Sequence, residues 1–144
     1  MQTKFLASIL TIALGASAAA VSRRDPVLGD PTCGVDGADT FLNHDDLGRA
    51  VDDFANWVAS GADGQVNIAG NFRGGLSREW GEVLLFACDS KSGGQGSYIS
   101  PELIRQVLEG GGYLDSQCKQ DNAGYESSND LTIGRTFKGD HFCD

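Results

Sequence analysis

The sequence predicts an α+β fold, a small disulfide-stabilised two-layer sandwich in which a mostly antiparallel sheet carries two helices on one face. Three observations favour this fold. Patterns typical of helices and of strands are mixed along the chain without regular alternation. The stretch from Gly81 to Lys119 has the pattern of a strand, a helix and a second strand, with a cysteine in each strand. The chain has 144 residues and four cysteines, so we expect one domain held by disulfides.

The start of the chain is expected to be a secretory signal peptide rather than part of the fold. Lys4 supplies a positive charge, Phe5 to Leu14 form an apolar core, and the small residues at 16–20 offer cleavage sites. We assign residues 1–20 to this signal and therefore expect the protein to be secreted and extracellular. No later stretch reaches the roughly twenty apolar residues that a membrane span needs.

A dibasic pair, Arg23 and Arg24, follows the signal and resembles a processing site for the fungal secretory-pathway protease. The alternative interpretation is two solvated arginines in a terminal tail. If the site is used, residues 21–24 are a pro-segment and residues 25–144 form the single mature domain.

The expected mature domain is strongly acidic. The whole chain has 11 basic and 20 acidic residues, and residues 1–24 contain three of the basic ones and no acid. The remaining 120 residues therefore carry 8 basic and 20 acidic groups, a net charge of −12. Such a charge repels phosphate backbones and anionic membrane surfaces, so nucleic acid is disfavoured as a partner.

The four cysteines, Cys33, Cys88, Cys118 and Cys143, all lie in the expected mature part. An even number of cysteines in a small secreted domain indicates disulfides. Three pairings are possible and the sequence alone does not choose among them. The pairing that we expect joins Cys88 to Cys118 within the central unit and Cys33 to Cys143 near the two ends. Zinc is the alternative, but no pair has the close spacing of zinc ligands, so no metal is expected.

The longest predicted helix runs from about Asp45 to Ser60. Asn43 is a typical N-cap residue, because its side chain can accept a free N–H of the first turn. Trp57 lies beside an apolar stripe at helical spacing and is expected to pack in the core rather than to serve as a ligand platform. The stripe consists of Leu47, Val51, Phe54 and Val58.

Strands are expected between the two helices. Gln65 to Ala69 alternate between polar and apolar residues, which indicates a strand. Leu76 to Trp80 lead back to the central strand, Glu82 to Cys88, whose continuous apolar run is typical of a buried strand. Tyr98 and Ile99 are expected to form a very short strand.

The second helix has clear signals at both ends. Ser100 is an N-cap type, Pro101 fits the first helical position, and the glycines at 110–112 end the helix.

The remaining part of the chain is expected to return to the sheet. Residues 113–118 alternate and predict a half-exposed strand, whereas the polar residues 119–129 predict a surface loop. Leu131 to Phe137 predict the last strand, with a bulge at Gly134.

No catalytic motif stands out in the sequence. His44 and His141, with Glu79 and Arg78, are residue types that a secreted ribonuclease uses, but nothing in the sequence brings them together. A carboxylate pair of the glycosidase kind can always be found among 20 acids, so it carries no signal. The glycine-rich residues 93–96 lack the lysine that follows a phosphate loop. We therefore expect no enzyme activity, no catalytic residue and no cofactor.

Several of these features occur together in known secreted proteins. They are Cys33-Gly followed by Asp39-Thr-Phe-x-Asn43, a helix ending near Trp57, an apolar strand into Cys88, a helix with Leu103-Ile104, a strand into Cys118, and a last strand that leads to Cys143. This arrangement resembles the fungal Ecp2-type secreted effectors (the Hce2 domain) and is similar to the KP4-type killer toxins, which are small α/β sandwiches. The resemblance implies a fungal effector or toxin-like protein without enzyme activity, and it assigns no site residues.

The leading hypothesis from the sequence is a secreted, effector-like or toxin-like monomer that acts by binding a host or competitor target, in virulence or antagonism. The partner expected is a protein or a cell-wall component. Two alternatives from other classes are a small secreted hydrolase and a passive protein associated with the cell wall.

Overall fold

The computed structural model describes residues 28–34, 38–68, 75–89, 96–128 and 130–143. The predictions of a signal peptide and of processing at Arg23 and Arg24 fall outside the described residues, as does most of the glycine-rich segment 93–96.

The described residues form a main antiparallel sheet, a two-stranded ribbon and helices that pack on the sheet. The strands are β1 Thr32–Cys33, β2 Val66–Ile68, β3 Leu76–Trp80, β4 Val83–Asp89, β5 Ser97–Ile99, β6 Gly124–Ser128 and β7 Leu131–Phe137. The helices are α1 His44–Ala59, α2 Pro101–Leu108 and α3 Tyr113–Gln117, with a 3-10 turn, η1, at Ala62–Gly64.

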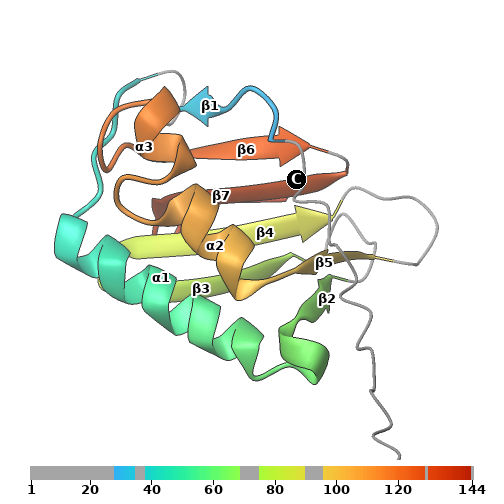
Figure 1. The fold of residues 1–144 in the computed structure, drawn as a ribbon. Coiled ribbons are helices and arrows are strands. Elements are labelled where there is room, and N and C mark those ends of the chain that lie inside the picture. Colours follow the sequence, from blue (N-terminus) through green and yellow to red (C-terminus); the bar gives the residue numbers. More distant parts are fainter. Residues whose placement is uncertain (1–27, 35–37, 69–74, 90–95, 129, 144) are drawn as a thin grey trace, which may run out of the picture.

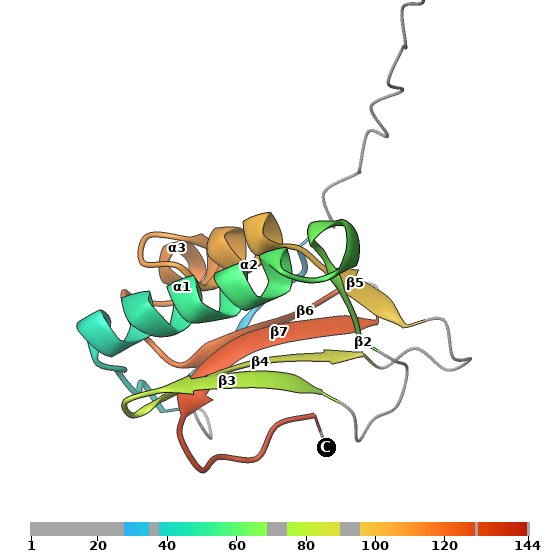
Figure 2. The ribbon, with the colours of Figure 1, turned by 90° about the horizontal axis from the view of Figure 1, so that it is seen from below.

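The main sheet has five strands in the order β1-β6-β7-β4-β3, and every neighbouring pair is antiparallel (Figure 1). The ribbon pairs β2 with β5, also antiparallel. Figure 2 shows the helices together on one side of this sheet, which confirms the predicted α+β architecture with its helices on one face. None of the helices in the described part of the chain is long and apolar enough to cross a membrane.

β4 is central to the sheet, and all seven of its residues are buried, which explains its continuous apolar sequence. Its odd-numbered residues from Val83 to Ala87 belong to the main core, which also contains the buried faces of α1 and α2. Its even-numbered residues from Leu84 to Cys88 form a second cluster with Phe142 and Cys143. The C-terminal segment therefore covers part of the sheet face opposite the helices, and β4 has apolar contacts on both sides.

The two longer helices begin where their capping residues predict. The Asn43 side chain accepts a hydrogen bond from the Asp46 N–H at 3.1 Å, and the Ser100 hydroxyl accepts one from the Leu103 N–H at 3.2 Å. Each bond satisfies a backbone donor that the first turn of a helix otherwise leaves free. These contacts are local in sequence, which is why the sequence alone predicts them.

The prediction of a strand over residues 113–118 is wrong, because Tyr113–Gln117 form the short helix α3. Only Leu114 of this helix is buried. The Asp115 carboxylate accepts hydrogen bonds from the Gly111 N–H at 2.7 Å and from the Asp121 N–H at 2.9 Å. One side chain thus satisfies backbone donors before and after α3, and this arrangement fits a helical turn rather than a strand.

The prediction of a surface loop over residues 119–129 is wrong for its second half, which forms β6. The backbone of β6 pairs with β1 on one side and with β7 on the other. Glu126 of β6 is buried and accepts a hydrogen bond from the Gly29 N–H at 2.6 Å. Backbone pairing with distant strands therefore makes a strand of a segment whose side chains are polar.

The predicted bulge at Gly134 is also wrong, because β7 pairs without interruption with β4 and β6. This glycine is needed for a different reason. A Cβ at this position would lie less than 3.0 Å from the side chains of Phe86 and Tyr125 and from the Gly124 carbonyl oxygen. Gly134 thus lets the aromatic side chains of the two neighbouring strands lie close to the backbone of β7.

Gly134→Ala is therefore expected to lower the free energy of unfolding by about 1–3 kcal/mol, since the methyl group forces its neighbours to move. Urea unfolding monitored by circular dichroism measures this change. Gly48→Ala is the matched control, because a Cβ at position 48 in α1 meets nothing within 4 Å. The control should gain about 0.5–1 kcal/mol from its higher helix propensity. A Gly134→Ala variant as stable as the wild type would contradict the close approach.

Candidate functional site

Two disulfides, Cys33–Cys118 and Cys88–Cys143, connect the cysteines, with Cα–Cα distances of 5.5 and 5.4 Å. The prediction that all four cysteines form disulfides is confirmed. The predicted pairing of Cys88 with Cys118 and of Cys33 with Cys143 is wrong.

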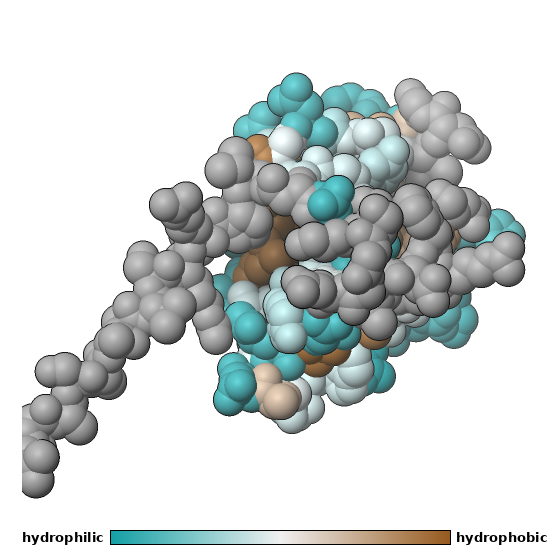
Figure 3. All heavy atoms as spheres, turned by 90° about the vertical axis from the view of Figure 1, so that its right-hand side faces the viewer, coloured by the Kyte–Doolittle hydropathy of each residue, from teal (hydrophilic) through white to brown (hydrophobic). Residues whose placement is uncertain are grey.

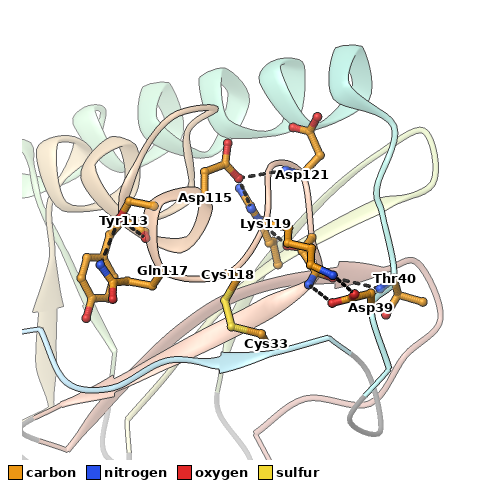
Figure 4. The surroundings of a disulfide bond; sticks show 12 residues. Cys33, Asp39, Thr40, Tyr113, Asp115, Gln117, Cys118, Lys119 and Asp121 are labelled. Carbon is orange, nitrogen blue, oxygen red and sulfur yellow. Dashed lines mark hydrogen bonds and ion pairs between the residues drawn. A yellow bond between two sulfur atoms is a disulfide. The ribbon is translucent and has the colours of Figure 1, made fainter.

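The alternation of β4 explains the observed pairing. Cys88 is an even-numbered residue of β4 and points away from the helices, into the cluster with Phe142 and Cys143. Cys118 directly follows α3, which lies in the helical layer, so the sheet separates it from the Cys88 side chain. Figure 4 shows Cys118 bonded instead to Cys33 of β1.

A buried polar network lies close to the Cys33–Cys118 disulfide. Arg135 of β7 is fully buried, and its guanidinium donates hydrogen bonds in three directions. Nε donates to the Asn122 carbonyl at 2.9 Å, and Nη1 donates to the Leu108 carbonyl at 3.0 Å. Nη2 donates to the Asp115 carboxylate in an ion pair. Arg135 therefore ties β7 to the end of α2, to α3 and to the start of β6.

Asp115 is the anionic partner in this network, and its side chain is only 5% exposed. Burial alone would raise the pKa of Asp115. Hydrogen bonds from the Gly111 N–H and from the Arg135 guanidinium, with the charge of Arg135 and the Asp121 N–H, outweigh burial and hold this pKa below its usual value. The carboxylate therefore stays ionised opposite the arginine.

His44 extends the polar network to the surface. Its Nδ1 lies 2.9 and 3.1 Å from the two carboxylate oxygens of Asp121, and its side chain is 62% exposed. The pKa of His44 is raised, first by the hydrogen bond to Asp121 and then by the charge of that carboxylate. This pair joins the start of α1 to the segment between α3 and β6.

The His44–Asp121 pair predicts a pH dependence of stability with a definite sign. Because the folded pKa of His44 is raised, its contribution is complete below the usual value of 6.5 and is lost as the pH rises through the folded value. We expect His44→Gln to be less stable than the wild type at about pH 5 and equally stable at about pH 9. Urea unfolding at both pH values measures this difference. A difference that is the same at both would show that the pair contributes no charge interaction.

A second group of side chains lies between α1 and β3 and includes Trp57 and Arg78. The guanidinium of Arg78 lies 4.4 Å from the ring centroid of Trp57, and Arg78 Nε lies 3.9 Å from the Asp53 carboxylate. Trp57 packs in turn against Phe54, with their ring centroids 6.2 Å apart. Trp80, at the end of β3, is 42% exposed. We call Trp57 and Arg78, together with Trp80 two residues farther along the same face of β3, the tryptophan–arginine cluster.

One atom of this cluster lacks a hydrogen-bond partner. Arg78 Nε is buried and has no acceptor within hydrogen-bond distance among the described residues, because Asp53 is too far away. Natural proteins rarely leave such a donor unsatisfied, so this buried atom is an exception in the packing of the cluster. Stacking of an arginine on a tryptophan ring also keeps both side chains in a defined orientation.

Other exposed aromatic residues lie singly on the described surface. Figure 3 shows the right-hand side of Figure 1, where small hydrophobic areas lie between hydrophilic residues of the described segments. Other exposed large hydrophobic residues are Phe41, Tyr98 and Tyr125. The tryptophan–arginine cluster differs from these, since a cation stacked on the partly buried Trp57 lies on the same face of β3 as the exposed Trp80 ring, and it is our candidate binding site.

The structure gives three of the four residues suggested for a ribonuclease different partners. His44 pairs with Asp121, Arg78 stacks on Trp57, and Glu79 pairs with Lys138 at 2.9 Å. The expected core position of Trp57 is supported, because it is partly buried and packs against the main core. In the part of the chain that the structure describes, no group of three or more metal-binding side chains comes together.

Sequence reasoning missed the roles of both Arg135 and Arg78. A signal for the first was present, because Arg135 is in phase with Leu131 and Ile133, which lie in the main core. A charged residue at a core-facing position of a strand requires a buried partner. Nothing local identifies Asp115 as that partner, since it is 20 positions away.

Comparison of the chain with family models, with curated proteins and with solved structures finds no match.

Proposed function

We propose that this protein is secreted and acts as an effector or toxin, by binding a host or competitor target. The observation that carries the proposal is the pair of disulfides. One ties β1 to the end of α3, and the other ties the C-terminal segment to β4. The N-terminal strand β1 is thereby fastened to the end of α3, and the C-terminal segment is fastened to the sheet. Disulfides of this kind form and persist in an oxidising, extracellular environment.

Other features support binding as the mode of action. The buried Arg135 network and the disulfides hold the strands and helices in one arrangement, which lowers the entropy cost of binding a partner. The tryptophan–arginine cluster offers the residue types that contribute most to protein interfaces. The resemblance of the sequence to Ecp2-type effectors and KP4-type toxins agrees with this proposal.

The test is to apply the disulfide-bonded protein, purified from a secreting host, to plant leaf tissue and to cultures of competitor fungi. We expect cell death, altered defence or growth arrest that disappears when the disulfides are reduced and the thiols blocked. His44→Ala and His141→Ala should retain the response, because the proposal assigns neither residue a catalytic role. Loss of the response in both variants, with normal folding, would favour a hydrolase. No response in either system would contradict the proposal.

A further inference from the structure

We propose that the outer edge of β3 binds an extended segment of a partner protein by strand addition. The segment carries apolar side chains opposite Leu76 and Trp80 and an acidic side chain opposite Arg78. This inference rests on the proposed binding function and specifies the partner that the tryptophan–arginine cluster fits.

The first step is the position of β3 in the sheet. Among the described residues, β3 is the last strand of the sheet and pairs only with β4 (Figure 1). In an antiparallel ladder, every second residue of an edge strand turns its N–H and C=O away from its neighbour. Such a row is a template for another strand. The opposite edge, β1, has only two residues, whereas β3 has five.

The second step is that β3 lacks two of the usual protections of an edge strand. Proline and bulges are two of the devices that protect edge strands, and charged side chains, which β3 does have, are another. β3 contains no proline, and its pairing with β4 is uninterrupted from Leu76 to Trp80. Both of its charged residues have partners within the chain, since Glu79 pairs with Lys138 and Arg78 stacks on Trp57.

The third step concerns the side chains next to the edge. Leu76, Arg78 and Trp80 lie opposite residues of β4 that point into the main core, so they occupy the sheet face that α1 covers. An added strand would place every second side chain beside them. Aromatic and β-branched residues pair well across strands, as do opposite charges. Trp80 and Leu76 therefore favour apolar partners, and the positive charge of Arg78, whose side chain is 34% exposed, favours a carboxylate.

A second copy of the chain fits this edge less well. Two β3 strands that pair antiparallel over their full length place Arg78 opposite Arg78 of the second copy. Like charges directly opposite each other in a sheet are destabilising. The edge is thus better suited to a different protein that supplies an acidic residue at this register.

The test uses a synthetic peptide, acetylated and amidated, with the sequence threonine-valine-threonine-glutamate-threonine-isoleucine-threonine. It is titrated into the disulfide-bonded, nitrogen-15-labelled protein and followed by two-dimensional NMR. We expect resonances of residues 76–80 and the Trp80 indole to shift, and Kd follows from the titration. A peptide with lysine in place of the glutamate should bind about two- to fivefold more weakly. This comparison leaves the protein unchanged.

A matched pair of variants tests the role of the arginine. Arg78→Ala should weaken binding of the glutamate peptide by about two- to fivefold and leave its lysine version unaffected or tighter. Arg105→Ala is the control. The Arg105 side chain is 37% exposed, close to the 34% of Arg78, and it forms an ion pair with Asp52 of α1. It removes the same charge and should leave Kd unchanged.

Three results would overturn the inference. They are the absence of β3 shifts at about 1 mM peptide, equal binding of the glutamate and lysine peptides, and β3 shifts that depend on protein concentration without peptide, which would indicate a second copy. The tissue and growth assays separate this inference from the proposed function. Full activity of Arg78→Ala in these assays would support the proposed function and contradict the inference that the β3 edge is the binding site responsible for it. If the protein bound the glutamate peptide selectively but had no effect in either assay, strand addition at β3 would be supported and the proposed function contradicted.

Discussion

Arg135→Met is expected to lower the free energy of unfolding by about 3–5 kcal/mol, because it leaves the buried Asp115 carboxylate without its cation. It also removes the donors to the carbonyl groups of Leu108 and Asn122, which are not replaced. Methionine has a similar length and no charge, so most of the packing volume is kept. Urea unfolding monitored by circular dichroism measures the change.

The same ion pair determines how the protein responds to acid. The lowered pKa of Asp115 means that its contribution to stability is present above the usual value of 3.8 and is lost as the pH falls through the lower folded value. In Arg135→Met the charge and the hydrogen bond of the arginine are absent, so the pKa of Asp115 should rise. The variant should therefore lose less further stability than the wild type when the pH falls through this range.

Arg105→Ala is the control for this experiment. Its ion pair with Asp52 is also short, at 2.7 Å, but Asp52 is 64% exposed. Exposed pairs contribute about 0–1 kcal/mol, because water screens the charges and both side chains lose freedom. If Arg135→Met and Arg105→Ala lowered the stability equally, Arg135 would not be the buried centre of the network.

Removal of either disulfide is the second change with a large expected effect. The disulfides join residues 85 and 55 positions apart. In the chain-entropy model, closing loops of these lengths restricts the unfolded chain and contributes about 4–5 kcal/mol for each disulfide. The double substitutions Cys33→Ala/Cys118→Ala and Cys88→Ala/Cys143→Ala should each lower the free energy of unfolding by about 2–5 kcal/mol.

The two double variants should differ in which part of the chain loosens. Without Cys88–Cys143, the C-terminal segment loses its covalent tie to β4. Amide hydrogen exchange should then rise in residues 138–143 and at the residues of β4 that this segment covers. Without Cys33–Cys118, exchange should rise in β1 and α3. Peptide mapping of the unreduced protein checks the pairing itself, and a peptide linking Cys88 to Cys118 would refute it.

Elements with local signals follow from the sequence alone. Asn43 and Ser100 cap their helices through residues three positions away, and β4 is an apolar run that only a buried strand explains. The tertiary structure was needed for β6, whose polar segment becomes a strand only because β1 and β7 lie on either side of it. It was also needed for α3, which depends on the contacts of Asp115 with Gly111 and Asp121.

The sequence by itself determined the α+β class, the main helices and the use of all four cysteines in disulfides, because these depend on periodicity, caps and composition within short windows. Only the tertiary structure decided which cysteines pair, which carboxylate meets Arg135 and which strand forms the open edge. The physical reason is that the first two depend on which face of the sheet the helices cover, and the third depends on the order in which the strands pair. Successive side chains of a strand point to opposite faces, so a cysteine on one face cannot reach a partner in the layer on the other.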